Sequence, residues 1–132
     1  MSLIKRFTLF IAVLVVSSNL IALPAFDIPD NIFAAMKLGN AEELSKHFNT
    51  SIELVILDQE DVYSKQQAEQ ILRNFFLKYK VQNFRLLHQG GKEDAQYAIG
   101  TLETDKGSFR VYFLVKQKND KAFIHQLRIE LE

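Results

Sequence analysis

The 132-residue chain contains no cysteine and no tryptophan, only two prolines, and no excess of either charge. Without cysteine, it has no means of forming disulfides, thiolate metal sites or thiol nucleophiles. Because 16 basic residues balance 16 acidic ones, the chain lacks the excess of positive charge that is typical of proteins that bind duplex nucleic acid or an anionic membrane surface. What the chain does contain, 48% apolar and 24% charged residues, is the composition of one folded domain of ordinary size.

The beginning of the chain has the pattern of a secretory signal peptide. Lys5 and Arg6 precede an unbroken apolar run at 7–16. A run of that length forms about 15 Å of helix, roughly half of a bilayer core, so a stable membrane span is disfavoured. We therefore predict that residues 1–25 are an export signal and that the chain touches a membrane only before cleavage.

Small residues near the end of this signal give two cleavage points, after Ala25 or after Ala22. Removal of the signal leaves a single domain over 26–132. A secreted chain without disulfides is typical of bacteria rather than of small secreted eukaryotic domains. We therefore expect a periplasmic or extracellular location in a bacterium.

The first half of the mature chain has the spacing of helices, with one strand between them. Asn40 with Glu43, and Ser64 with Gln67, have the spacing of a capping box, which opens a helix. Gly39 follows the first apolar stripe and suits a left-handed helix end. The pattern predicts helices at 31–38, at 41–48 and from Ser64 to about Tyr79, and a strand at 51–57.

From Val81 onward, apolar and polar residues alternate with a period of two, which indicates strands. Turn residues at 90–91, 105–107 and 118–120 divide these strands. The expected strands are 82–89, 95–104, 108–117 and 121–131. The predicted fold class is therefore α+β, with helices packed on one face of an antiparallel sheet.

The alternation also predicts which residues face each other. The odd-numbered residues of 108–117 and 121–131 are mostly apolar, so we expect them on the helix-covered face. A three-residue turn at 118–120 keeps the faces of these two strands matched. It pairs Val115 with Phe123, Phe113 with His125, Val111 with Leu127 and Phe109 with Ile129, and a similar turn at 105–107 sets Gly100 opposite Tyr112.

A small set of polar side chains is expected on the helix-covered face. Its members are Tyr97, His125, His88 and Thr101. An apolar hollow with a few polar groups is typical of a small-molecule pocket, so these four residues are pocket candidates. The alternative is that each lies at the edge of the core with a local hydrogen-bond partner.

On the opposite face, the expected register sets Arg110 directly across from Arg128. Like charges in that arrangement destabilise a sheet, so they indicate a site for an anion or an acidic partner. The alternative is a solvated face on which Glu103 and Glu130 are the counter-charges. Arg85 is expected to lie near Tyr112 in a cation–π arrangement. The outer-face candidates for an anion or a partner are Arg85, Arg110, Arg128 and Tyr112.

Apolar residues are also expected among the polar ones on this outer face. Their number indicates a surface for a partner protein or a homodimer. They are Leu87, Leu102, Leu114 and Ile124.

Four stretches of the chain resemble a bacterial family known as domain of unknown function 4783. They are SKQQAEQILRNFF (64–76), YAIGTLET (97–104), GSFRVYFLVK (107–116) and FIHQLRIE (123–130). The order of helices and strands is similar to that of the nuclear transport factor 2-like (cystatin-like) superfamily. This resemblance implies a curved antiparallel sheet, a pocket between the sheet and the long helix, and frequent dimerisation through the sheet. It implies no reaction and no ligand, because the superfamily includes enzymes and binding modules alike.

The sequence offers little of what catalysis needs. An isomerase needs a buried carboxylate as its base, and Glu53, the one carboxylate in the first expected strand, is expected to point outward. No nucleophile elbow for a serine triad is present. The histidines, His47, His88 and His125, lack the spacing of metal ligands.

We therefore expect an exported, non-catalytic module that binds a ligand or a protein, with no cofactor and no metal. Its partner would be a small molecule or an envelope protein, not a nucleic acid, and the chain is a candidate homodimer. The alternative is an enzyme of the isomerase or dehydratase type, which would use Tyr97 and His125 in the pocket between the long helix and the sheet.

Overall fold

The structure is a computed structural model, and it describes residues 26–132. The predicted export signal lies outside the described residues. Within the described part of the chain, no helix combines the length and the apolar character needed to cross a membrane. The elements are α2 (Asp30–Leu38), α3 (Ala41–Ser45), β1 (Phe48–Ile56), β2 (Gln59–Ser64), α4 (Lys65–Lys78), β3 (Val81–Gly91), β4 (Ala95–Thr104), β5 (Gly107–Lys118) and β6 (Lys121–Leu131).

Local sequence sets the helix boundaries largely as expected. Gly39 ends α2 in a left-handed conformation, with φ of 62° and ψ of 36°, which costs glycine little. The Asn40 side chain accepts a hydrogen bond from the Glu43 amide at 3.1 Å and so caps α3. At the start of α4, the Ser64 hydroxyl accepts from the Gln67 amide while the Gln67 side chain accepts from the Ser64 amide. The capping box predicted for α4 is therefore confirmed.

The end of α3 and the start of β1 differ from the prediction. α3 ends at Ser45, and β1 begins at Phe48 rather than at Ser51. Phe48 fits the helical stripe that includes Leu44, but it also fits a strand. The neighbouring strand decides between them, because Phe48 pairs with Ile124 of β6 and is only 1% exposed.

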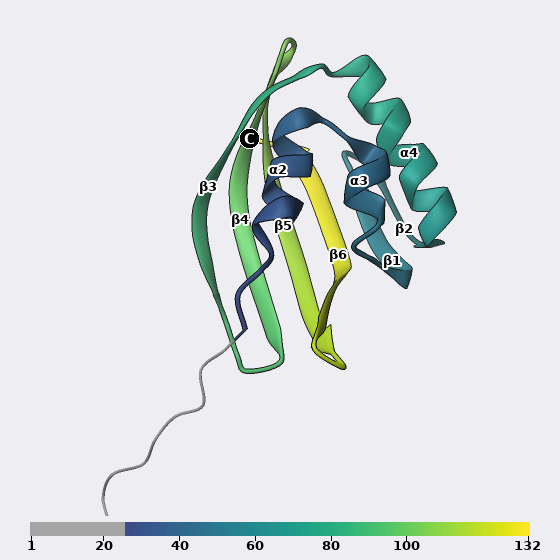
Figure 1. Ribbon diagram of the computed structural model, residues 1–132. Helices are drawn as coiled ribbons and strands as arrows, with labels where there is room; N and C mark the ends of the chain where they lie inside the picture. The colour runs from purple at the N-terminus through teal and green to yellow at the C-terminus, as the bar shows by residue number, and fades with distance from the viewer. Residues whose placement is uncertain (1–25) are drawn as a thin grey trace, which may run out of the picture.

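The sheet has six strands in the order β2-β1-β6-β5-β4-β3, and it is curved and open (Figure 1). The expected all-antiparallel arrangement is wrong at one place, because β1 runs parallel to β6. β2 was not predicted. Its sequence, QEDVYS, is exposed at every position except the half-buried Tyr63, so it has no alternation of apolar and polar residues to signal a strand. Such an exposed strand is tolerated at the edge of a sheet.

The helices lie on one face of the sheet, as Figure 1 shows, so the α+β prediction is confirmed. The ring of Phe33 on α2 lies 6.1 Å from that of Phe84 on β3 and 6.0 Å from that of Phe113 on β5. The ring of Phe75 on α4 lies 5.4 Å from that of Phe109 on β5. Both α2 and α4 therefore pack on this face of the sheet, and Leu44 of α3 belongs to the same buried cluster.

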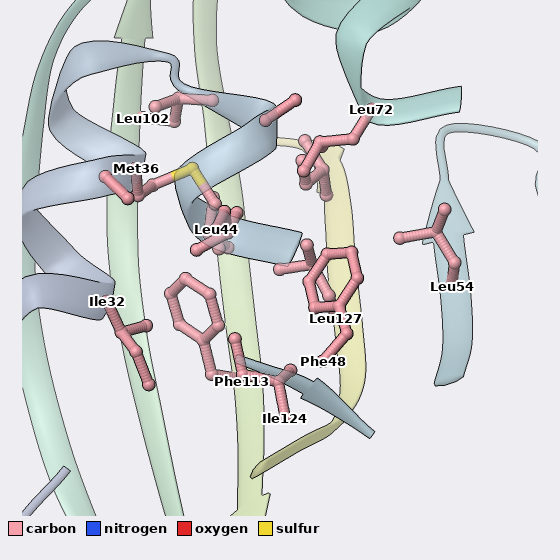
Figure 2. Close-up of a cluster of buried hydrophobic side chains, with 14 of the residues drawn as sticks. Ile32, Met36, Leu44, Phe48, Leu54, Leu72, Leu102, Phe113, Ile124 and Leu127 are labelled. Carbon is pink, nitrogen blue, oxygen red and sulfur yellow. The ribbon is translucent and has the colours of Figure 1, made fainter. Parts of the chain in front are cut away.

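Hydrophobic side chains fill the space between the helices and the sheet (Figure 2). Phe113 and Leu127 from the sheet and Leu72 from α4 belong to one cluster and are fully buried. The apolar odd-numbered residues of β5 are all buried, as predicted; they are Phe109, Val111, Phe113 and Val115.

The turn between β5 and β6 is shorter than expected. It consists of two residues, Asn119 and Asp120, with φ of 52° and 62°, and it pairs Lys118 with Lys121. Asn and Asp tolerate positive φ, and two-residue turns with positive φ match the twist of a hairpin. A turn of this length makes the odd residues of β5 face the even residues of β6 near the turn.

A β-bulge at His125 then restores the match between the two inner faces. Val115 pairs with Ile124, whereas the next residue of β5, Leu114, pairs with Gln126, so His125 is the extra residue. The four predicted pairs and the inward direction of Phe123 are therefore wrong. The pairs present are Val115–Ile124, Phe113–Leu127, Val111–Ile129 and Phe109–Leu131.

The turn between β4 and β5 is also shorter than expected. Thr104 pairs with Gly107, so only two residues connect the strands. The even residues of β4 therefore face the helices, and Gly100 pairs with Val111 rather than with Tyr112. Leu102 and Ile124, which were predicted on the outer face, are fully buried in the core.

Candidate functional site

The four predicted pocket residues lie on the outer face of the sheet, away from the helices. Tyr97 and Thr101 are odd residues of β4, whose even residues face inward. His88 pairs with Ile99 of β4 and shares its face. His125 lies in the bulge of β6 and is half-buried. Their predicted inward direction is wrong, because the β4–β5 and β5–β6 turns are each one residue shorter than expected and a β-bulge lies between Leu86 and His88 on β3.

Two of these residues contact each other directly. His88 Nε2 and the Tyr97 hydroxyl form a hydrogen bond of 2.9 Å. The Tyr97 ring stacks at 19° on that of Tyr112, with ring centroids 6.3 Å apart. The Thr101 hydroxyl donates to Glu132 Oε1 at 3.4 Å. Each of these polar groups therefore has a local hydrogen-bond partner or neighbour on the outer face.

His125 does not meet Tyr97. β5 lies between their strands, and strands two places apart are separated by about 10 Å. Burial lowers the pKa of His125 below its ordinary value of 6.5, and the charge of Lys116 lowers the pKa further. The pair that the isomerase alternative would use is not assembled in this structure.

The predicted opposition of Arg110 and Arg128 is wrong. Arg110 pairs with Glu130 across β5 and β6, and Arg128 pairs with Tyr112. Each outer-face arginine instead has a carboxylate partner. The ion pairs are Arg85–Glu103 at 3.0 Å, Arg110–Glu132 at 3.2 Å and Arg128–Glu130 at 2.7 Å.

The hydrogen bond from Arg128 to Glu130 also raises the pKa of that guanidinium, with a further contribution from the charge of Glu130. Two of the observed pairs use the counter-charges named by the alternative reading, Glu103 and Glu130. With their charge compensated in this way, the arginines offer less to a free anion than an unpaired cluster would.

The centre of the outer face is aromatic and aliphatic. We call it the outer aromatic band, and its residues are His88, Tyr97, Ile99, Tyr112 and Leu114. All but His88 are half-buried in the single chain. The band continues towards β1 through Arg128, which is paired with both Tyr112 and Val55.

A groove that the sequence did not predict lies between the β1–β2 turn and the second half of α4. Its volume is about 500 Å³, and Leu57, Asp58, Phe75, Lys78 and Tyr79 are among its lining residues. Because β2 carries no strand signal, nothing in the sequence indicates a turn beside α4. Among the described residues, no group of three or more histidines and carboxylates is positioned to hold a metal ion.

Comparison with known proteins gives matches that agree with one another. A family model described as "Domain of unknown function (DUF4783)" matches residues 29–130. A crystal structure of a DUF4783 family protein from Bacteroides ovatus is 36% identical to this chain, with a TM-score of 0.77, and the match covers 80% of this chain and 96% of that one. A second such structure, from Bacteroides fragilis, is 34% identical, with a TM-score of 0.77 and coverage of 80% and 100%.

A designed protein named "Rd1NTF2_04 with long sheet" is 20% identical to this chain and matches it with a TM-score of 0.63. The match covers 76% of this chain and 94% of the designed one, and it concerns the fold alone. No curated protein matches the chain.

Proposed function

The chain belongs to the DUF4783 family and has a nuclear transport factor 2-like fold, and from this premise we propose that it is an exported, non-catalytic module that binds protein through the outer face of its sheet. The fold is compatible with ligand binding and prescribes no reaction. The occupant that we propose for the outer face is a second copy of this chain.

The observation that carries this proposal is the composition of the outer face. The outer aromatic band is apolar at its centre, and the ion pairs of Arg85, Arg110 and Arg128 surround it. An apolar centre with a polar rim is the usual anatomy of a protein interface. Tyrosine and arginine are also the residue types that carry most of the binding energy at such interfaces.

The charges on this face favour a second copy over a strongly charged partner. Basic and acidic side chains nearly balance, so two copies of the face would not repel each other. A symmetric dimer needs such a self-complementary face. The charged residues concerned are Arg85, Arg110, Lys116 and Arg128, with Glu53, Glu60, Glu103, Glu130 and Glu132.

Support for a non-catalytic role comes from the helix-covered face. There the side chains of Phe48, Leu72, Phe113 and Leu127, at most 1% exposed, occupy the space in which the superfamily places its pocket. Tyr97 and His125 lie on the other face, on strands that are not neighbours. Support for export is the pattern of residues 1–25 alone.

The state of association of the purified mature chain tests the proposal. Light scattering at micromolar concentration should give the mass of a dimer, and Tyr112→Glu at the centre of the band should give a monomer with an unchanged circular dichroism spectrum. Leu77→Glu is the matched control, because Leu77 is 73% exposed on α4 and the same charge there should leave the dimer intact. A monomeric wild-type chain would contradict the second copy as the occupant.

A further inference from the structure

The groove between the β1–β2 turn and α4 lies on the opposite side of the sheet from the outer aromatic band. Its volume of about 500 Å³ falls within the range in which proteins bind small molecules. The turn supplies one wall through Leu57, and the second half of α4 supplies the other through Ile71, Phe75 and Tyr79. An inference drawn from this groove is independent of the interface proposed above.

The walls of the groove are apolar. Phe75 is 6% exposed and forms part of the core, and its ring contacts the rings of Tyr79 at 4.8 Å and Phe109 at 5.4 Å. Ile71, Leu57 and Tyr79 pack against the core while they remain half-exposed to the groove. The walls of the groove are therefore backed by the closely packed core.

The backbone of Leu57 points to a role for its side chain. Its φ is 53°, a left-handed value that is uncommon for a residue other than glycine, asparagine or aspartate. The β5–β6 turn of the same chain uses Asn119 and Asp120 for the same purpose. Leucine adopts this conformation at a higher energetic cost than asparagine or aspartate, and the Leu57 side chain forms one apolar wall of the groove. Its amide donates a hydrogen bond of 2.9 Å to the Ile129 carbonyl, which fixes the turn against β6.

Two lysines lie close to the Tyr79 ring, which lines one end of the groove; Lys78 is itself a lining residue, whereas Lys106 comes from the β4–β5 turn and lies outside the lining. Lys78 Nζ lies 5.4 Å from the centre of the Tyr79 ring, and Lys106 Nζ lies 5.8 Å from the same centre. Between residues 26 and 132, neither ammonium group has a carboxylate within 4.0 Å. The remaining polar lining residues are Asn74, Asp58 and Gln59.

We propose that this groove binds a small amphipathic anion, with an unbranched apolar chain along Leu57, Ile71 and Phe75 and a carboxylate between Lys78 and Lys106. We expect a negatively charged head group, because the ammonium groups of Lys78 and Lys106 lie near Tyr79 and neither forms an ion pair within the described residues. Asp58, the acidic group of the lining, comes from the turn and would repel a head group placed near it. The ligand therefore has one favoured orientation.

The test uses sodium decanoate as the probe, with the purified mature chain and titration calorimetry. Decanoate should bind, and decanol, which has the same chain without the charge, should bind about tenfold more weakly because it makes no charge-assisted hydrogen bonds. Acetate, which has the head group alone, should not bind measurably. In two-dimensional NMR, decanoate should shift the amides of Leu57 and Lys78.

The variants separate the two parts of the site. Replacing both Lys78 and Lys106 with glutamine should weaken decanoate binding about tenfold and leave decanol binding unchanged. Leu57→Gly relaxes the backbone but removes one wall and its packing against the core, so it should weaken both ligands while the chain stays folded, as its circular dichroism spectrum checks. Lys116→Gln on the outer face of β5 is the matched control and should change neither.

Three results would overturn the proposal. One is equal binding of decanoate, decanol and decyltrimethylammonium. Another is an unchanged decanoate affinity in the double lysine variant. The third is a set of NMR shifts on the outer aromatic band instead of the groove. None of these depends on whether the chain dimerises.

Discussion

The ring of Phe84 on β3 lies directly over Gly100 on β4, so a Cβ at Gly100 would overlap the ring's Cζ and would lie 2.7 Å from the carbonyl oxygen of Arg85. The ring has no room to move away, because it stacks on Phe33 and meets Phe113 edge-on, each at 6.1 Å. An aromatic ring therefore covers the bare backbone of Gly100. The covering ring is that of Phe84 on β3, whereas the predicted neighbour of Gly100, Tyr112, lies on β5 at the other side of β4.

Gly100→Ala should destabilise the fold by about 1–3 kcal/mol, because the added methyl group overfills a closely packed site. The measurement is the urea unfolding midpoint of wild type and variant. Ser108→Ala, at an exposed position of β5, is the control and should stay within about 0.5 kcal/mol. An unfolding midpoint for Gly100→Ala equal to that of the control would show that the ring can move.

Deletion of His125 should be tolerated, whereas deletion of Arg128 should not. Without His125, Gln126 follows Ile124 directly and the ladder with β5 becomes regular, while Leu127 still faces inward. We expect a loss of about 1–2 kcal/mol from the altered strand bend. Deletion of Arg128 instead turns Ile129 to the outer face, because a shift of one residue exchanges the faces of a strand.

Circular dichroism and urea unfolding of both deletion variants provide the measurement. The variant without His125 should keep a cooperative transition, and the variant without Arg128 should lose it. The reverse order would mean that the bulge is needed for the curvature of the sheet.

Acid should destabilise the fold through two histidines. Burial is the main cause that lowers the pKa of both His47 and His125 below the ordinary value of 6.5. The unfolded chain therefore binds these protons at higher pH than the folded chain does. Their stabilising contribution is fully present above pH 6.5 and is lost as the pH falls through the two folded-state pKa values.

NMR titration of the histidine ring protons should place both pKa values below 6.5. His125→Gln should make the stability less dependent on pH between neutral and mildly acid conditions. A pKa at or above 6.5 for His125 would mean that solvent reaches its ring freely.

Export should remove the first residues of the chain. Expressed in a bacterium with an envelope, the protein should be recovered outside the cytoplasm with its new N-terminus at Phe26 or Leu23, as read by mass spectrometry. Val13→Arg, a charge in the apolar run, should leave the full chain in the cytoplasm. Ser2→Arg is the matched control and should not. Recovery of uncleaved wild-type protein from the cytoplasm would contradict the signal.

Most of the elements could be predicted from the sequence because each of those has a local cause. Ser64 with Gln67 opens α4, Gly39 ends α2, and the alternation in β5 places Phe113 in the core. β2 escaped prediction for a local reason too, since an edge strand exposed on both faces has no hydrophobic pattern.

The faces of the candidate residues could not be predicted, because they depend on the length of a turn. Three residues or two between β4 and β5 decide whether Tyr97 faces the helices or the solvent, and Gly107 is compatible with either count. The bulge at His125 shifts the register of β6 by one residue, and the alternation of the sequence does not indicate where such a bulge lies. The groove beside Leu57 could not be predicted either, because it forms where a turn lies beside a helix, and the spacing of apolar residues does not indicate such a contact.

The parallel pairing of β1 with β6 has a consequence for synthesis on the ribosome. β6 is the strand that joins the β1–β2 hairpin to the β3–β5 meander, and it is translated after all of them. Until it emerges, the two halves of the sheet have no shared edge, and the inner side chains of each stay only partly covered. The sheet is therefore completed only when β6 is synthesised. A chain that stops within β6 would keep the β1–β2 hairpin and the β3–β5 meander unpaired and prone to aggregation.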